Sequence, residues 1–326
     1  MRFTPEEKAD TIELVLSSPD GITRTLKALG IHKRTFYNWY HAYAEGGTEA
    51  LRSRKRTRSQ WNQIPESVKA LVVTVALENG NTTLSPRELA VKITDEMGLF
   101  ISESSVYRIL KHRGLIRPAE HHFIQAADEF KNKTIVPNQM WQTDFTYFKI
   151  LGWGWYYLST VIDDYSRYIV HWELCKSMQW TDVKRTVAAA VNKAGLRKGQ
   201  MPKLLSDNGP GYIAGELQQH LDKEYGMKQI HGKPMHPQTQ GKIERYHRSI
   251  KSIIKLHNYY CPQELERAIT QFVDYYNNNR YHESLKNLTP CAVYFGKGDK
   301  ILKKRAELKA YSLKERRKFF KKQSIV

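Results

Sequence analysis

The sequence has few cysteines and no long run of apolar residues. Its three cysteines, Cys175, Cys261 and Cys291, are too few and too widely spaced for a disulfide framework or a zinc finger. We therefore expect no structural zinc and a reducing, cytoplasmic setting. A membrane partner is disfavoured because no long apolar segment, signal peptide or lipidation motif is present.

Acidic residues are also scarce relative to basic ones. The chain has 33 Asp and Glu against 52 Lys and Arg, which gives a formal net charge of +19. This excess predicts a polyanionic partner, and DNA is the stronger choice once a membrane surface is disfavoured. Such binding is sensitive to salt and largely independent of sequence, because it depends on counterion release. A length of 326 residues with 40% hydrophobic content supports two or three domains.

Three of the acidic residues stand in settings that a purely structural role explains poorly. Asp144 interrupts a strand-like run of aromatic and β-branched residues, where acids are depleted. Asp207 follows a short apolar strand at 203–206, and the carboxyl ends of strands in open α/β sheets are where ligands bind. Glu244 lies in a segment, Lys242–Asn258, whose apolar residues recur at helical intervals, so it can project from a helix toward the aspartates.

Together these three carboxylates predict a site that holds divalent metal for phosphodiester chemistry. Magnesium prefers oxygen ligands, and two ions about 3.5 to 4 Å apart can activate the attacking oxygen and stabilise the leaving one. We expect Mg²⁺ at Asp144, Asp207 and Glu244, with Mn²⁺ able to substitute. A single acid taken alone is more often a solvated surface group. Asp163 and Asp164 open a turn, and we expect them only to form local hydrogen bonds.

A series of motifs surrounds these residues in a fixed order. They are WQTDFTYFK at 141, GWGWYYLSTVIDDYSRYIV at 152, LLSDNGP at 204, HPQTQGKIERYHRSIK at 236 and FVDYYNNNRYHESLKNLTP at 272. With them the chain resembles, from about Trp141 to Phe295, the insertion-sequence transposases whose catalytic domain belongs to the retroviral integrase superfamily. That family has a catalytic Asp, Asp, Glu triad, and the resemblance assigns it to Asp144, Asp207 and Glu244. The gap from Asp207 to Glu244 is 244 − 207 − 1 = 36 residues, one more than the spacing most often cited, which a loop insertion absorbs.

The resemblance implies an RNase H-like fold, and the hydrophobic pattern agrees with it. An antiparallel meander followed by alternating strands and helices predicts a mixed sheet flanked by helices. The expected strands are 141–150, 155–162, 168–174, 203–206 and 227–231, and the expected helices are 181–194, 215–225 and the one that carries Glu244. The predicted fold class is thus multidomain, with an α-helical amino-terminal region and an α/β RNase H-like catalytic core.

Sequence specificity is expected from two candidate helix-turn-helix units before about residue 117. The first has helices at 23–29 and 33–43, and the second has a helix beginning at Ser85 and Pro86 and another at 102–112. The second helix of such a unit lies in the major groove. The residues expected to contact DNA there are Lys33, Arg34, Tyr37, Asn38, Ser104, Ser105, Arg108 and Lys111. A small helical bundle used for protein contacts is the alternative.

A basic run without an acid, residues 52–58, separates the two units. Its members Arg54, Lys55, Arg56 and Arg58 are expected to follow phosphates or enter a minor groove. A solvated linker is the alternative interpretation.

The predicted Glu244 helix carries basic residues beside its carboxylate. Arg248 and Lys251 lie at i+4 and i+7 from Glu244, and Lys242 lies two residues before it. The resemblance implies contact of such residues with the terminal DNA of the element, whereas an ordinary helix ion pair between Glu244 and Arg248 is the alternative. His247 on the same helix is expected to pack or form hydrogen bonds rather than to bind metal.

These features predict six segments along the chain. They are a helix-turn-helix domain at 1–50, a basic linker at 51–63, a second helix-turn-helix or winged-helix-like domain at 64–116, a linker at 117–138, the catalytic core at 139–260 and a helical extension with a basic tail at 261–326. The non-periodic stretch at 232–241 is expected to form a mobile loop beside the site.

The predicted function is that of a DNA transposase. It would bind the terminal inverted repeats of its element, cleave the element ends and join the 3′ ends to target DNA. Two ends must be joined, so we expect a homo-oligomer assembled on DNA and associated with a bacterial nucleoid. One alternative is a DNA-binding regulator whose catalytic domain is inactive, and intact acids at all three positions argue against it. A nuclease acting on RNA in hybrids is disfavoured, since it does not need helix-turn-helix units.

Overall fold

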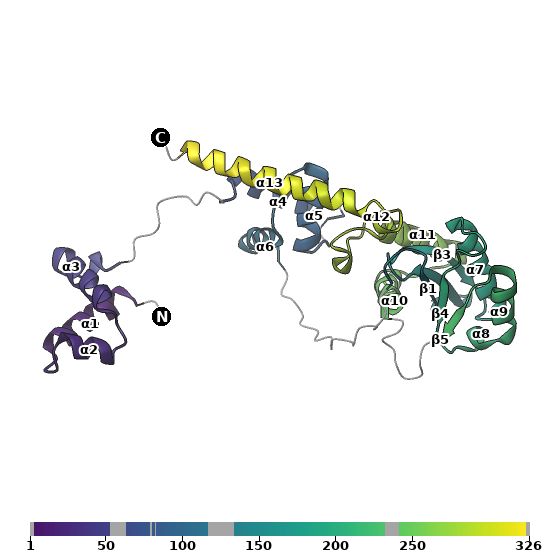
Figure 1. Cartoon of the computed structure of the whole chain (residues 1–326), viewed down its shortest axis with the longest axis horizontal. Coiled ribbons are helices and arrows are strands. Elements are labelled where there is room, and N and C mark those ends of the chain that lie inside the picture. Colours follow the sequence, from purple (N-terminus) through teal and green to yellow (C-terminus); the bar gives the residue numbers. More distant parts are fainter. Residues whose placement is uncertain are drawn as a thin grey trace. The chain divides into compact units, whose positions relative to one another are not determined.

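The computed structural model describes residues 3–52, 63–78, 80–81, 83–116, 134–231 and 241–323 of the chain. The chain divides into two compact units, one made of Met1–Gln63 with Arg317–Val326 and the other of Ile64–Arg316. Figure 1 labels their helices and strands. Among the helices of these described ranges, none is long and apolar enough to cross a membrane.

The first unit contains three helices around one small core. Their bounds are α1 Pro5–Ser17, α2 Ile22–Ala28 and α3 Lys33–Ala50. The first begins with a capping box, in which the Thr4 side chain accepts from the Glu7 N–H and the Glu7 side chain accepts from the Thr4 N–H. Phe36 of α3 is fully buried among apolar side chains of all three helices. The predicted pair of helices is confirmed as α2 and α3, whereas α1 was not predicted from the sequence.

A second group of three helices opens the larger unit. Their bounds are α4 Glu66–Leu77, α5 Pro86–Met97 and α6 Glu103–His112. The predicted helix start at Ser85 is confirmed, because Ser85 and Glu88 form a capping box and Pro86 occupies the first helical position. Gly98 ends α5 in the left-handed region at φ 64°, which glycine adopts without strain.

A five-stranded mixed sheet follows, as predicted. Its strands are β1 Met140–Ile150, β2 Gly154–Asp163, β3 Ile169–Cys175, β4 Lys203–Ser206 and β5 Gln229–His231. They lie in the order β3-β2-β1-β4-β5, with β1 to β3 antiparallel and β4 parallel to both β1 and β5. The pairing of β1 with β4 covers only Met140 to Gln142, so the rest of β1 has no described strand on that side.

Helices cover both faces of the sheet, and further helices follow it in the sequence. The remaining helical elements are α7 Trp180–Ala194, α8 Pro210–Ile213, α9 Gly215–His220, η1 Leu221–Tyr225, α10 Gly241–Ile254, α11 Pro262–Asn278, η3 Glu283–Leu285, α12 Pro290–Tyr294 and α13 Gly298–Gln323. The predicted helices at 181–194 and around Glu244 are confirmed as α7 and α10. The predicted helix at 215–225 is confirmed as α9 continued by the π-helical turn η1.

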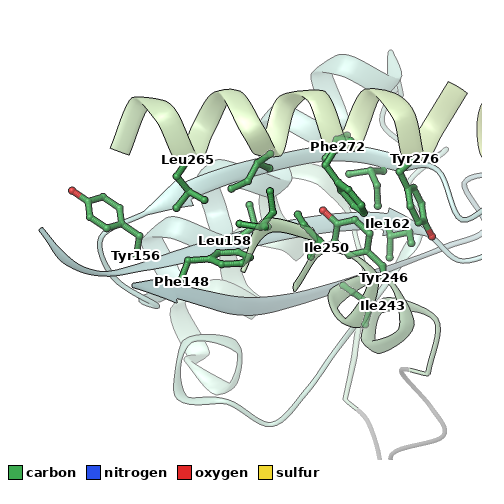
Figure 2. Packing of buried hydrophobic residues seen from close by; sticks show 14 of the residues in the cluster. Phe148, Tyr156, Leu158, Ile162, Ile243, Tyr246, Ile250, Leu265, Phe272 and Tyr276 are labelled. Carbon is green, nitrogen blue, oxygen red and sulfur yellow. The ribbon is translucent and has the colours of Figure 1, made fainter. Parts of the chain in front are cut away.

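Successive side chains of the strands point to opposite faces of the sheet and pack in two separate cores. Phe148 and Leu158 lie on the face covered by α10 and α11, whereas Trp141 and Val161 lie on the face covered by α7. Figure 2 shows residues of α10 and α11 converging on the first of these faces. The apolar residues of α11 recur at Leu265, Ile269, Phe272, Val273 and Tyr276, which is the spacing of one buried helical stripe.

The helices α4 to α6 are joined to the rest of the larger unit by polar contacts. Arg305 of α13 donates to the Asp95 carboxylate through Nε at 2.7 Å and through Nη2 at 2.6 Å. The Phe100 N–H donates to the Ser312 hydroxyl at 3.1 Å. A bidentate arginine to carboxylate pair fixes both distance and orientation, so this contact holds α5 against α13.

The loop between α11 and η3 contains a histidine that gives a pH prediction. His282 packs its ring against Tyr276 at 5.0 Å between centroids. Burial, followed by the positive charges of Arg280 and Arg167, lowers its pKa from 6.5 to about 3. The imidazole is therefore neutral in the folded chain but protonates below about pH 6.5 when unfolded. The contribution of the neutral imidazole to the free energy of unfolding is therefore fully present above pH 6.5 and is lost as the pH falls toward 3.

We expect His282→Phe to reduce the acid sensitivity of folding. The variant keeps a ring beside Tyr276 but cannot take up a proton. Between pH 7 and pH 5 the native chain should lose up to about 2 kcal/mol more stability than the variant. Thermal unfolding of both chains at the two pH values measures this difference, and equal losses would show that His282 does not contribute.

Candidate active site

Strand pairing brings Asp144 and Asp207 to the same edge of the sheet. β1 and β4 are parallel neighbours, and their last paired residues are Gln142 and Leu205. Each aspartate lies two residues beyond that pair, so the two carboxylates occupy equivalent positions on adjacent strands. In open α/β sheets, ligands bind at the carboxyl ends of such strands.

Asp207 is held by the turn that follows β4. Its Oδ1 accepts a hydrogen bond from the Gly209 N–H at 2.9 Å. A Cβ atom at position 209 would lie 3.0 Å from the same oxygen, so glycine permits this close approach. Partial burial raises the pKa of the Asp207 carboxyl, and the negative charge of Asp144 raises it further. The negative charge of one aspartate therefore disfavours that of the other, and their oxygen donors fit a hard divalent ion.

Asp144 is fixed by two neighbours. Its Oδ1 accepts from the Phe145 N–H at 2.8 Å, and its Oδ2 lies 3.3 Å from Nδ1 of His247. The His247 side chain is buried on α10. From the sequence, His247 was expected only to pack or to form hydrogen bonds, and its contact with Asp144 was not predicted. Its position three residues after Glu244, on the same face of the helix, was the available signal.

Glu244 lies in the first turn of α10 and is exposed. One helical turn separates it from His247, the residue that contacts Asp144. Across the described ranges, no three His, Cys, Asp or Glu side chains gather closely enough to hold a metal ion. The structure therefore brings Asp144 and Asp207 together and leaves Glu244 on the adjoining helix, outside that pair.

A buried polar network ties the start of α10 to β1 and β2. Lys242 donates to Oδ2 of Asp164 at 2.6 Å and to its backbone carbonyl at 2.9 Å. The Gln142 amide donates to Oδ1 of Asp164 at 2.7 Å and accepts from the Ile243 N–H at 3.2 Å. Gln142 lies two residues before Asp144, and Ile243 directly precedes Glu244. The network therefore fixes the helix that carries Glu244 relative to the strand that carries Asp144.

This network adds a contact to one expected residue and confirms the expected role of another pair. Lys242 was expected to contact DNA, and in the structure its ammonium group pairs with Asp164, so its DNA contact stays a prediction. Asp163 and Asp164 were expected to form local hydrogen bonds, and Asp163 accepts from the Ser166 N–H at 2.8 Å and the Ser166 hydroxyl at 2.6 Å. Asp164 does more than expected, since it also pairs with the distant Lys242.

The two other basic residues of α10 occupy different positions. Arg248 is exposed. Lys251 is partly buried and places its Nζ 4.7 Å from the centroid of the Tyr147 ring. Burial lowers the pKa of Lys251, and the nearby charge of Asp144 acts in the opposite direction. Both cations therefore lie on a helix beside the aspartate pair.

The expected DNA contacts of the helix-turn-helix units are mainly at the surface. In α3, Lys33, Arg34 and Asn38 are exposed, whereas Tyr37 is partly buried against Phe36. In α6, the exposed residues are Ser104, Arg108 and Lys111 and the partly buried one is Ser105. Both helices are thus free to present polar groups outward.

Some expectations fall on residues that the structure does not describe. The basic residues Arg54, Lys55, Arg56 and Arg58 lie outside the described ranges, as do residues 117–133 of the expected linker. The same holds for residues 232–240 of the expected loop beside the site.

Four family models match this chain. Two models described as an integrase core domain match residues 136–237 and 225–290. A helix-turn-helix domain matches residues 7–59, and a homeodomain-like domain matches residues 35–110. These matches and the mixed sheet confirm the fold class that the sequence predicted.

Individual relatives match different shares of the chain. The transposase for insertion sequence element IS629 of Shigella sonnei is 26% identical over 266 residues, which is 78% of this chain and 85% of the relative. InsK of Escherichia coli, named as a transposase for insertion sequence element IS150, is 31% identical over 159 residues. This chain spans about half of the InsK length, since the match covers 55% of it and 48% of this chain.

The solved structures that match part of this chain include a viral integrase. The catalytic core domain of the HTLV-2 integrase, solved in complex with magnesium, superposes with a TM-score of 0.40 at 21% sequence identity. The superposition covers 50% of this chain and 98% of that domain.

Proposed function

We propose that this chain, which matches models of an integrase core domain and of a helix-turn-helix domain, is an insertion-sequence DNA transposase. The observation that carries the proposal is the placement of Asp144 and Asp207 at equivalent positions of two adjacent parallel strands. The raised pKa of Asp207 supports it, because two neighbouring carboxylates that disfavour each other's charge suit a cation better than a structural role. The net charge of +19 suits a DNA substrate.

Asp144, Asp207 and Glu244 are proposed to hold divalent metal during the reaction. When bound, Mg²⁺ or Mn²⁺ supplies charge that activates the attacking oxygen and stabilises the leaving oxygen at phosphorus. Magnesium is commonly bound by one or two carboxylates together with waters and phosphate oxygens. The aspartate pair meets that need, and Glu244 would join it from α10 when DNA occupies the site.

The surrounding side chains are proposed to hold these ligands in position. Gly209 donates its N–H to Asp207 and so orients one carboxylate. His247 contacts Asp144 and restrains the other. The Lys242 to Asp164 pair anchors the first turn of α10, which limits where Glu244 can move. Fixed ligands of this kind are what metal-assisted phosphoryl chemistry requires of a protein.

The proposed reaction has two steps at one site. Water first cleaves the element end and frees a 3′ hydroxyl, which then attacks a phosphodiester of target DNA. The same carboxylates serve both steps, and no covalent protein intermediate forms. Because two ends must be joined, we propose that several copies of the chain assemble on DNA. The helix-turn-helix units would bind the terminal inverted repeats.

The test is a joining assay with labelled DNA carrying both ends of the element that encodes this chain. We expect cleavage and transfer of the labelled 3′ end to a plasmid in Mg²⁺ or Mn²⁺, and neither product in EDTA. Specific binding of the ends without any cleavage, in both metals and under conditions that support assembly, would favour the regulator instead.

The exposed residues of α3 give a prediction about DNA recognition. Arg34 lies at the start of the proposed recognition helix, whereas Arg24 lies on α2, the first helix of the unit. We expect Arg34→Ala to weaken binding to element ends about tenfold and to reduce discrimination against unrelated DNA, because arginine can contact base edges in the major groove. Fluorescence anisotropy with end DNA and scrambled DNA at fixed salt measures both quantities.

Arg24→Ala is the matched control for Arg34→Ala. A phosphate contact from α2 should weaken binding to both DNAs by similar factors and lower the salt dependence of the binding constant by about one counterion. If the Arg34 variant also loses affinity equally for both DNAs, α3 does not read sequence.

A further inference from the structure

A cluster of aromatic and basic side chains, three of them exposed on the β1–β2 hairpin and one partly buried on α10, lies beside the aspartate pair. It consists of Tyr147 and Lys149 of β1, Trp155 of β2 and Lys251 of α10, and is called the hairpin patch below. Tyr147 is 50% exposed and Trp155 is 52% exposed. Single exposed aromatics are ordinary, but two in contact with each other and with lysines form an organised surface.

The four side chains of the hairpin patch contact one another. The rings of Tyr147 and Trp155 meet edge to face, with centroids 5.4 Å apart and planes at 76°. Nζ of Lys149, which lies directly opposite Trp155 in the strand register, is 5.9 Å from the centroid of the Trp155 ring. Nζ of Lys251 is 4.7 Å from the Tyr147 ring. The two rings therefore stand between two ammonium groups.

In the described ranges, the two rings of the hairpin patch are about half exposed. β4 pairs with β1 only as far as Gln142, so no described strand continues beside Tyr147 and Lys149. In the part of the chain that the structure describes, Lys149 and Lys251 form no ion pair with an acidic side chain. The patch thus offers half-exposed aromatic rings beside two ammonium groups, which complements a nucleic acid strand rather than an apolar protein surface.

The hairpin patch also lies near the proposed chemistry. Tyr147 follows Asp144 by three residues on the same strand, about 10 Å at the usual rise per residue, and the two side chains leave opposite faces beside the edge of β1 that β4 does not pair with. Lys251 lies close enough to Asp144 for the negative charge of that carboxylate to raise the pKa of Lys251. A DNA strand held at the aspartates could therefore reach the patch with its next nucleotides.

We propose that the hairpin patch binds unpaired DNA, with a base stacked on Tyr147 and Trp155 and the adjoining phosphates near Lys149 and Lys251. This inference rests on the proposed function and adds a feature of the substrate, since it requires that the strand be unpaired beside the cleavage site. Stacking tolerates any base because every base has an aromatic face, so the patch would position the strand without reading its sequence.

The experiment measures binding of the full chain to a labelled single-stranded oligonucleotide and to the blunt duplex of the same sequence. Fluorescence anisotropy is recorded in EDTA, so binding is separated from cleavage. We expect Trp155→Ala to raise the Kd for the single strand about tenfold and to change the Kd for the duplex less than twofold. Trp155→Phe should recover most of the lost affinity because it retains a stacking ring.

Tyr311→Ala is the matched control, since Tyr311 is 62% exposed on the lysine-rich helix α13 and lies outside the patch. It should leave both Kd values unchanged. Tyr147→Ala provides a second test if Trp155→Ala folds poorly in thermal unfolding. Unchanged single-strand affinity in the folded patch variants would overturn the inference. So would a lower molecular mass of Trp155→Ala by light scattering with unchanged DNA affinity, which would identify the patch as an interface between copies.

Two different results would refute the role of the hairpin patch and the proposed transposase activity. A chain that joins DNA ends but whose single-strand affinity is insensitive to Trp155 refutes only the role of the patch. A chain that binds single strands through Trp155 but joins nothing refutes the transposase activity.

Discussion

Asp207→Asn is expected to abolish the joining of DNA ends, with a rate at least about 1,000-fold below that of the native chain. The substitution retains an oxygen that can accept from the Gly209 N–H but removes the negative charge next to Asp144. A divalent cation bound between the two positions would lose much of its attraction. Denaturing gels of labelled end DNA in Mg²⁺ measure the loss.

The same substitution should not destabilise the metal-free chain. Burial and the charge of Asp144 raise the pKa of Asp207, so its stabilising contribution is present at low pH and is lost as the pH rises through the folded-state pKa. At pH 7 the ionised carboxylate therefore costs stability, and the Asp207→Asn chain should unfold in EDTA at the same or a slightly higher temperature. This separates loss of catalysis from loss of folding.

Asp222→Asn is the control, because Asp222 is an exposed acid on η1. It should join DNA at the native rate. Full joining activity in the Asp207→Asn chain would contradict the assignment of Asp207 as a metal ligand, and equal losses in both variants would point to a nonspecific effect of charge.

Lys242→Met is expected to cause the largest loss of stability among single changes near the site. The Asp164 carboxylate is only 4% exposed, and its pair with Lys242 offsets the cost of burying it. Removing one partner leaves a buried charge unpaired, which costs about 2 to 3 kcal/mol when allowance is made for the partial exposure of Lys242. Thermal unfolding should show a Tm lower by about 5 to 10 °C.

The double variant Asp164→Asn with Lys242→Met tests the reason for that loss. It removes both charges, so it should regain part of the stability that Lys242→Met loses. Lys255→Met is the matched control, since Lys255 is an exposed lysine just beyond the same helix. Equal Tm values for Lys242→Met and Lys255→Met would show that the buried pair contributes little.

The sequence predicted the features that depend on local pattern. The strands around Asp144 and before Asp207 were identified because alternation and short apolar runs are local signals. The start of α5 was identified because Ser85, Pro86 and Glu88 form a helix-start signature within four residues. The order of elements then favoured a mixed sheet, which the structure confirms.

Contacts between segments distant in the chain could not be predicted from the local sequence pattern. Lys242 was expected to face DNA because its charge could be read but its partner Asp164, on another element, could not. The contact of His247 with Asp144 was missed for the same reason. The exposure of Tyr147 and Trp155 was not predicted either, because it depends on which distant segments cover the hairpin.

The most direct test of the central claim is to locate the metal in crystals of the chain grown with element-end DNA and Mn²⁺. Diffraction at the manganese absorption edge identifies the ions independently of the protein density. We predict two anomalous peaks about 3.5 to 4 Å apart, in contact with carboxylate oxygens of Asp144, Asp207 and Glu244. Ordered DNA at this edge of the sheet with no peak at either aspartate would contradict the claim.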